Sequence, residues 1–330
     1  MKNNQEDYKT SVSGRVGRRL VSKLHRKQRH CCRAAQFGLA LILGAMALGV
    51  ATAGPGYPQP EQGKVAPTER AQPLDSRWAE IQARGRIRVG LDPSLGPAYL
   101  YTDLERQTYA GFEWDILEAL AQTLQVQVDP IYVAWSEQLA ALQADEVDLI
   151  WGAREALGLD PEQFLATRPY YLSPQRLVVR DPSPASGPEE PAIEALSQLF
   201  GRKVGIVVNS TGAALLEAYN ERRGNAIRLF ATSNPERLFA QLQAGQLDAV
   251  LVDQPVAALN LRQAGSRLRL VGPPLFPMPL VGVVSSQHPS LKEAVDGAIS
   301  SLIENGTLQQ ILEKWQLWDP TLMSPASTED

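Results

Sequence analysis

The chain has 330 residues, of which 36 are acidic and 32 basic, and its formal net charge is −4. Ten of the basic residues and two of the acidic ones fall within residues 1–53, so the other 22 basic and 34 acidic residues leave 54–330 near −12. This acidic balance argues against a nucleic-acid partner, which requires a basic face, and we expect none.

The N-terminal stretch has the pattern of an export signal. Its basic part ends at Arg33, residues 37–53 carry no charge, and Ala51-Thr52-Ala53 precedes Gly54 as a small-x-small cleavage site. The alternative is an uncleaved membrane anchor, but the uncharged stretch is short of the roughly 20 residues that a spanning helix needs. We therefore expect cleavage and a periplasmic protein, with residues 1–53 as signal peptide or membrane anchor.

The exported part must be held together by its apolar core. Both cysteines, Cys31 and Cys32, fall within the leader, so no disulfide is expected. One histidine, His288, follows the leader, which makes a histidine metal site or a Ser-His-Asp triad a poor fit. We expect no metal and no cofactor. Residues 54–75 are proline-rich and are predicted to be a linker.

Two successive segments have the same predicted order of elements. Helical spacing, apolar runs and turn residues predict helices at 77–83, 114–124 and from Ser136 through 142, and strands at 87–92, 126–133 and 147–151. The second segment is predicted to have strands at 204–208, 227–230 and 247–252, a helix at 213–219 and a helix opened by Asn234-Pro235. Residues 142–150 also align with 242–250 at a separation of 100. Two copies of one α/β unit imply two lobes.

The C-terminal part is predicted to return to the first lobe. A strand is expected at 280–285 after a proline-rich stretch, and capping boxes at Ser290 and Thr307 are expected to open two helices. We expect the first lobe to comprise residues 76–175 and 283–320, the second lobe residues 176–282, and a polar tail residues 321–330. Each lobe is predicted to be a wound, mainly parallel sheet with flanking helices.

Ligand-binding residues are expected just after the strands, because parallel sheets bind ligands beyond the carboxyl ends of their strands. The candidates at these positions are Asp92, Leu95, Tyr99, Trp151, Gly152, Arg154, Asn209, Ser210, Thr211 and Asp253. The turn Asn209 to Gly212 is expected to place free backbone N–H groups at a helix start, which suits a carboxylate. The alternative is that Ser210 or Thr211 only caps the helix.

The chain resembles the extracytoplasmic solute-binding protein family 3, the polar amino-acid receptors of ABC importers, over about residues 78–318. The resemblance is carried by the following motifs in order: Arg86 to Gly90, Gly111 to Asp115, Trp135 with Leu139, Leu142 and Asp148, Pro169 to Tyr171, Gly201 to Gly205, Leu247 to Asp253, and Asn305 to Trp315. It implies an α/β fold of the type II periplasmic-binding-protein class, in which two lobes close around a ligand by hinge motion.

The resemblance also implies residue roles. Ser210 and Thr211 would bind the α-carboxylate of the ligand and Asp253 its ammonium group. Asp92 would face the ligand side chain, with Leu95 and Tyr99 as walls.

One departure from the family pattern concerns the arginine that usually clamps the carboxylate. Asp160 stands at that position, and Arg154 is the nearest substitute unless it is a surface charge. The family's Pro-Pro-Phe wall is also altered, here to Gly96-Pro97-Ala98-Tyr99.

The expected function is that of a monomeric, non-enzymatic receptor. It would capture a small polar solute, an amino acid or related compound, and deliver it to an ABC permease in the cytoplasmic membrane. One alternative is a dehydratase acting on a cyclic prephenate-like acid, with Glu113, Glu155 or Asp160 as general acid. Another is a ligand sensor anchored to the membrane by an uncleaved leader.

Overall fold

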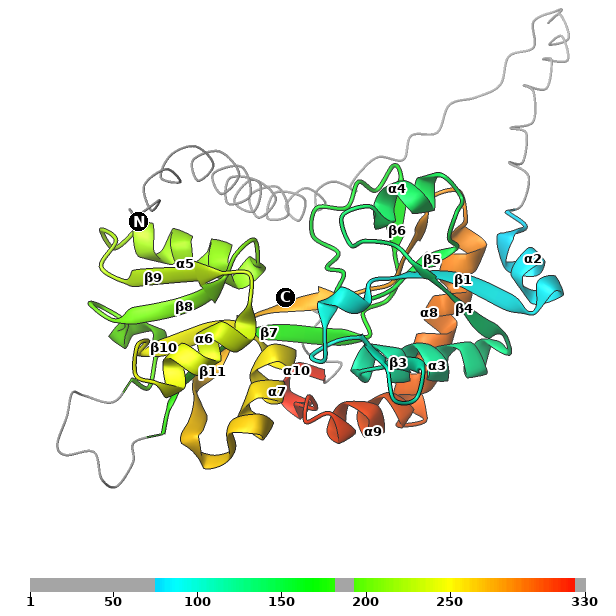
Figure 1. The fold of residues 1–330 in the computed structure, drawn as a ribbon. Coiled ribbons are helices and arrows are strands. Elements are labelled where there is room, and N and C mark those ends of the chain that lie inside the picture. The colour runs from blue at the N-terminus through cyan, green and yellow to red at the C-terminus, as the bar shows by residue number, and fades with distance from the viewer. Residues whose placement is uncertain (1–74, 182–192, 324–330) are drawn as a thin grey trace, which may run out of the picture. The chain divides into compact units, whose positions relative to one another are not determined.

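The computed structural model describes residues 75–181 and 193–323 (Figure 1). The predicted leader and most of the predicted linker, the loop at 182–192 and residues 324–330 of the tail are outside these ranges. Within the described ranges, no helix is both long and apolar enough to cross a membrane.

The first sheet has the strand order β4-β1-β5-β12-β6. Its strands are β1 (Arg86–Leu91), β4 (Gln127–Tyr132), β5 (Leu149–Ile150), β6 (Phe164–Ala166) and β12 (Val283–Ser285). Strand β1 is parallel to β4 and β5, whereas β12 is antiparallel to β5 and β6. The helices that belong to this part are α2 (Arg77–Arg84), α3 (Phe112–Leu124), α4 (Gln138–Gln143), α8 (Pro289–Glu304) and α9 (Thr307–Lys314). A hairpin of β2 (Tyr101–Asp103) and β3 (Thr108–Ala110) precedes α3.

The second sheet has the order β11-β7-β10-β8-β9. Its strands are β7 (Tyr171–Arg180), β8 (Lys203–Val207), β9 (Arg228–Thr232), β10 (Ala249–Asp253) and β11 (Leu268–Leu280). Strand β8 is parallel to β9 and β10, and β7 is antiparallel to β10 and β11. The helices here are α5 (Thr211–Glu221), α6 (Pro235–Gln243) and α7 (Gln254–Ala264), and a short helix α10 (Pro320–Met323) contacts β7.

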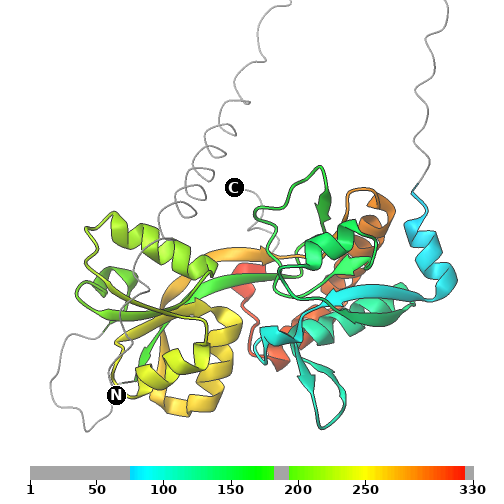
Figure 2. The ribbon, with the colours of Figure 1, turned by 45° about the horizontal axis from the view of Figure 1, so that its top comes forward.

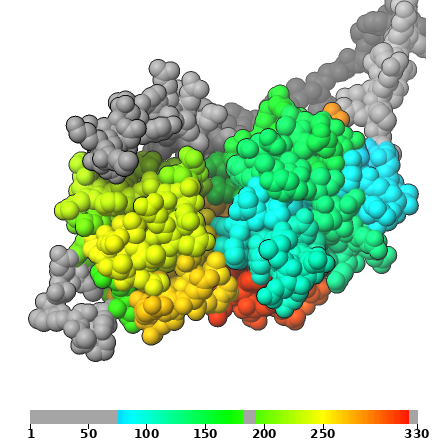
Figure 3. Space-filling view, viewed as in Figure 1, coloured from blue at the N-terminus to red at the C-terminus, as the bar shows by residue number. Residues whose placement is uncertain are grey.

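Each sheet with its helices forms one lobe, and β7 and β11 run between the two lobes (Figures 1 and 2). The two strands are paired from Tyr171 opposite Leu280 to Arg180 opposite Leu268. The lobes lie against each other along a crease in the space-filling view (Figure 3). This is the predicted two-lobe α/β class, with three neighbouring parallel strands on one side of each sheet, β4-β1-β5 and β10-β8-β9. The exact lobe boundaries at 175/176 and 282/283 stay a prediction.

Strand β11 differs from the sequence prediction. Four prolines, Pro273, Pro274, Pro277 and Pro279, lie inside it, whereas the sequence interpretation begins a strand only after them, at Leu280. The predicted strand 280–285 is instead divided between the end of β11 and β12. Prolines are tolerated because β11 is the edge strand of its sheet and pairs only with β7, with two shifts of register.

The predicted helix caps have mixed outcomes. The Asn234 side chain accepts a hydrogen bond from Arg237 N, with Pro235 as the first helical residue, as predicted. The caps predicted at Ser136, Ser290 and Thr307 are wrong. Their helices begin after Glu137, His288 and Gly306, and none of these three has a side-chain cap hydrogen bond. Helix α7 was not predicted from the sequence at all.

The internal repeat reappears as two equivalent aspartates. The carboxylate of Asp148 accepts a hydrogen bond from Arg88 N at 2.8 Å, and that of Asp248 accepts one from Lys203 N at 2.7 Å. Their backbone N–H groups donate to the carbonyl oxygens of the same two residues. The aspartates differ in burial, since Asp148 is 1% exposed and Asp248 is half-buried. Asp148 is also paired with the guanidinium groups of Arg77, Arg84 and Arg88.

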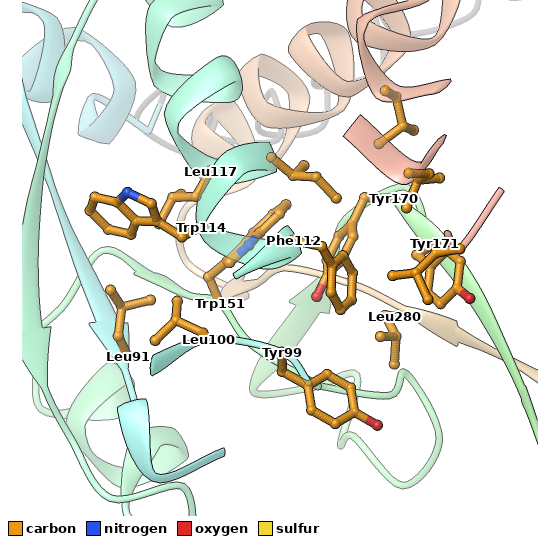
Figure 4. Close-up of a cluster of buried hydrophobic side chains, with 14 of the residues drawn as sticks. Leu91, Tyr99, Leu100, Phe112, Trp114, Leu117, Trp151, Tyr170, Tyr171 and Leu280 are labelled. Carbon is orange, nitrogen blue, oxygen red and sulfur yellow. The ribbon is translucent and has the colours of Figure 1, made fainter. Parts of the chain in front are cut away.

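A fully buried carboxyl group, that of Glu113, lies in the first lobe. It is beside the aromatic cluster that includes Trp151 and Tyr170, and Figure 4 shows this cluster. Glu113, in the first turn of α3, accepts hydrogen bonds from the Tyr170 hydroxyl at 2.7 Å and from Ala153 N at 2.8 Å. Next to it, the rings of Trp151 and Tyr170 are stacked with their centroids 4.1 Å apart. Burial raises the pKa of Glu113 to about 7, although the hydrogen bonds from Tyr170 and Ala153 act in the opposite direction.

Removing the Asp148 carboxylate should destabilise the protein strongly, because Arg84 would lose its counter-charge and the partly buried Arg77 and Arg88 would keep only the exposed Asp145. We expect Asp148→Asn to lower the free energy of unfolding by on the order of 3 kcal/mol. The matched change Asp248→Asn in the other copy of the repeat should lower it by only about 1 kcal/mol. Urea unfolding of both variants measures the difference, and equal losses would contradict a special role for the arginine cluster.

The buried Glu113 should make stability fall as the pH rises from about 4.5 to about 7. In this interval the carboxyl group ionises in the unfolded chain but keeps its proton in the folded protein, so unfolding is increasingly favoured; above the interval the effect is constant. We expect wild type to lose about 3 kcal/mol relative to Glu113→Gln between pH 4.5 and 8. Urea unfolding at both pH values tests this, with Glu118→Gln on the exposed side of α3 as control. A wild-type protein that loses no stability relative to Glu113→Gln would disprove it.

Candidate functional site

The carboxyl ends of the central strands of both sheets face the crease between the lobes. A cavity of about 590 Å³ lies there, and it is lined from both lobes. Four sequence-predicted residues line it, Leu95 and Tyr99 from the first lobe and Ser210 and Asp253 from the second. The starts of α6 and α7 contribute further lining residues, among them Asn234 and Val256. Its volume is in the range of cavities that hold small molecules.

Asp253 joins the two lobes at this cavity. Its Oδ2 accepts a hydrogen bond from the Tyr99 hydroxyl at 2.8 Å, and its Oδ1 accepts one from the side-chain amide of Gln175. Gln175 lies directly opposite Asp253 on the neighbouring antiparallel strand β7. Burial, followed by the charge of Asp253, raises the pKa of the Tyr99 hydroxyl far above its usual value, so Tyr99 acts here as a donor. In Figure 4 its hydroxyl points away from the aromatic core.

The start of α5 is also in contact with the first lobe. Asn209 is exposed and has a positive φ of 59°, which turns the chain after β8. Ser210 is the helix cap, because its hydroxyl accepts a hydrogen bond from Ala213 N at 3.0 Å. Thr211 has a different partner, since its hydroxyl lies 2.9 Å from both carboxylate oxygens of Glu155 on the loop after β5.

Asp92 and Leu95 shape the first-lobe wall. The two carboxylate oxygens of Asp92 accept hydrogen bonds from Ser94 N at 2.9 Å and Trp135 N at 2.8 Å, and the residue is 5% exposed. Its carboxylate therefore ties two loops together and does not line the cavity. Leu95 packs against the core and reaches the cavity wall.

Trp151, Gly152 and Arg154 lie behind this wall. Trp151 is fully buried, and its Nε1 donates to the carbonyl oxygen of Glu113 at 3.0 Å. Gly152 has a φ of 119°, and a Cβ atom there would approach Leu95 Cδ1 at 3.2 Å and Glu113 Oε2 at 3.3 Å. Arg154 is 6% exposed, so the interpretation of Arg154 as a surface charge is wrong.

The guanidinium of Arg154 is engaged within its own lobe. It donates to the Trp135 carbonyl at 2.8 Å and to Gln138 Oε1 at 2.9 Å, and it stacks 3.7 Å over the Trp135 ring. Burial lowers its pKa to about 10, which leaves it charged at neutral pH. Asp160, at the expected clamp position, is exposed and accepts hydrogen bonds from Glu162 N and the Gln163 side chain.

Sequence reasoning missed two residues of this region. Glu155 entered only as a conceivable acid of a dehydratase, and Gln175 was not singled out. No clear signal singled out Gln175, because its neighbours Ser173 and Arg176 in the same strand are also polar. No local signal connects Glu155 to Thr211, since the two residues are 56 positions apart.

The comparisons agree with the fold. The probable amino-acid-binding protein YxeM of Bacillus subtilis (strain 168) is 24% identical over 228 residues, which are 67% of this chain and 81% of the relative. The L-cystine-binding protein TcyJ of Escherichia coli (strain K12) is 24% identical over 237 residues, 72% of this chain and 84% of the relative. An ancestral arginine-binding protein bound to arginine superimposes with a TM-score of 0.55 at 25% identity and covers 70% of this chain and 98% of that structure.

The similarity extends over both lobes, so the predicted type II periplasmic-binding-protein fold is confirmed. The model of the bacterial extracellular solute-binding proteins, family 3, matches residues 87–317, from strand β1 to the end of α9. The chain therefore belongs to the bacterial extracellular solute-binding proteins, family 3.

Proposed function

We propose that the protein is a receptor that captures a small polar solute, an amino acid or a related compound, between its two lobes and delivers it to an ABC permease. The observation that carries this proposal is the cavity of about 590 Å³ at the crease, with Tyr99 and Asp253 contributed by different lobes. A ligand held by both lobes would favour the closed arrangement, which is how binding shifts an open–closed equilibrium.

The relatives support a binding role. YxeM is described as a probable amino-acid-binding protein and TcyJ as an L-cystine-binding protein. For the alternative of a dehydratase, two of the three candidate acids are badly placed, because Glu113 is fully buried and Asp160 lies on an exposed loop. The third, Glu155, lies at the crease with both carboxylate oxygens against the Thr211 hydroxyl, and the relatives favour binding over catalysis. We therefore propose a monomeric binding protein without catalytic activity.

The proposed site residues in this receptor are Leu95, Tyr99, Ser210 and Asp253, which line the cavity, and Thr211, which is the first residue of α5 and does not line it. Tyr99 and Leu95 would form the wall of the first lobe, and Asp253 would accept a donor group of the ligand. Asn209 would position the start of α5. Asp92, Trp151 and Arg154 would support the loops behind the wall, because their side chains are engaged there and do not line the cavity. Gly152 would allow the close packing of this loop against Leu95 and Glu113.

A solute that binds the folded state alone should raise the melting temperature of the full-length chain. At a concentration one hundred times its Kd, we expect a stabilisation of about 2.7 kcal/mol, or a shift of about 5–10 °C. A thermal-shift screen against amino acids and small carboxylates identifies such a ligand. The double variant Thr211→Ala with Asp253→Ala should lose the shift but remain folded.

Thr123→Ala with Asp129→Ala, on α3 and β4, is the control, because neither residue lines the cavity and this variant should keep the full shift. A full shift in the Thr211 and Asp253 double variant would place the ligand elsewhere.

Export is the second part of the proposal. We expect signal cleavage after Ala53 and release to the periplasm, so the mature protein should begin at Gly54. N-terminal sequencing of the protein recovered from the exported fraction measures this. A mature chain that keeps residues 37–53 and sediments with membranes would instead support the anchored sensor.

A further inference from the structure

The start of helix α5 holds a carboxylate that belongs to the chain itself. Thr211 Oγ1 lies 2.9 Å from both oxygens of Glu155, at the place where the resemblance puts the carboxylate of a bound amino acid. The backbone around Glu155 is fixed to the crossing strand. Val281 N donates to the Arg154 carbonyl at 2.9 Å, and Glu155 forms a bridge with Leu280. An incoming carboxylate would therefore meet a carboxylate that is already in position.

A second carboxylate, Asp253, lies close enough to Glu155 to affect its ionisation. Burial raises the pKa of Glu155, the Thr211 hydroxyl lowers it, and the charge of Asp253 raises it further. Among residues 75–181 and 193–323, no ion pair includes Glu155 or Asp253. Neutral hydroxyl and amide donors hold both groups, so their negative charge is not compensated by a nearby cation.

Arg154, which the sequence analysis offered as the partner of a ligand carboxylate, binds groups of its own lobe instead. Both Nη2 hydrogen bonds of Arg154 go to Trp135 and Gln138, and its plane is stacked on the Trp135 ring. Asp160 replaces the expected clamp with a negative charge. Neither residue therefore offers an amino acid a free cationic partner for its carboxylate.

An unpartnered acceptor completes the set. Gln175 is 1% exposed, and its Oε1 has no hydrogen-bond partner, although its amide nitrogen donates to Asp253. This oxygen is directed at the first turn of α5, since a Cβ atom on Gly212 would lie 2.2 Å from it. A buried acceptor without a donor is unfavourable, so Gln175 adds to the excess of acceptors beside the two carboxylates. Glu155, Asp253 and Gln175 are thus three acceptors around one helix start.

We propose that this site selects an organic cation without a free carboxylate, such as an aliphatic amine, a diamine or a guanidine, and that Glu155 is the residue that determines this specificity. The proposal rests on the proposed receptor function and names its ligand class. Nitrogen donors of the ligand lie between the carboxylates of Glu155 and Asp253, each of which has lone pairs beyond those used by the protein. An α-carboxylate is rejected because it meets Glu155 as a like charge.

Matched ligand pairs test this directly. Isothermal titration of the full-length chain compares agmatine with arginine, cadaverine with lysine, and putrescine with ornithine, because the members of each pair differ only in the α-carboxylate. We expect at least one amine to bind at least tenfold more tightly than its amino-acid partner. If an amino acid binds as tightly as its amine or more tightly, the cation selectivity is wrong but the receptor function stands. If no compound of either series binds, the cation selectivity is overturned, and the thermal-shift screen against the wider set of solutes decides the receptor function separately.

Three variants assign the selectivity to Glu155. Glu155→Gln keeps the size of the side chain but removes its charge, and it should weaken amine binding about tenfold to hundredfold and narrow the gap to the amino acid. Glu155→Asp keeps the charge and should retain the preference for the amine. The control Glu162→Gln, an exposed position later in the same loop, should change neither affinity. Unchanged binding and selectivity in a folded Glu155→Gln protein would overturn the assignment, and loss of the preference in Glu155→Asp would overturn it independently.

Discussion

The pairing of β7 with β11 is the constraint on which the site depends. These two strands belong to the second sheet, and they extend to the loops of the first lobe, where Tyr170 N donates to the Leu280 carbonyl at 3.1 Å. The β7–β11 pair sets the position at which the carboxyl ends of the central strands of both sheets face the crease. It also carries chemistry, because Gln175 of β7 is the residue that orients Asp253. Strand β7 thus helps to position the two lobes and also orients the carboxylate of Asp253, which lines the cavity.

The distribution of charge follows from the same arrangement. The buried cation Arg154 is kept inside the first lobe by a carbonyl, an amide oxygen and the face of Trp135. The carboxylates are placed at the crease, where hydroxyl and amide groups satisfy part of their hydrogen-bonding capacity. The carboxylates at the contact between the lobes therefore have hydrogen-bond donors, but among the described residues they have no cation to balance their negative charge. A receptor that closes on its ligand can use such an imbalance, since the missing charge arrives with the solute.

Regular features of the chain could be predicted from the sequence because they depend on neighbouring residues. Apolar spacing predicted most helices and strands, and the repeat at a separation of 100 predicted two similar lobes, which reappear in the contacts of Asp148 and Asp248. The helix caps at Ser290 and Thr307 were wrong because α8 begins at Pro289 after His288, and α9 begins at Thr307 itself after Gly306. Glu155, the hydrogen-bond partner of Thr211, could not be predicted, because it lies on a loop 56 residues away and comes close to Thr211 only in the folded protein.

The prolines of β11 have a consequence for how copies of the protein behave toward one another. An edge strand presents unpaired N–H groups on which a strand of another molecule can add, and this is a common route to aggregation. Pro273, Pro274, Pro277 and Pro279 have no N–H group to offer, and the register shifts between Val271 and Met278 interrupt the regular ladder. The long strand that joins the lobes is thereby a poor template for intermolecular sheet growth, so the protein can keep an extended edge without polymerising through it.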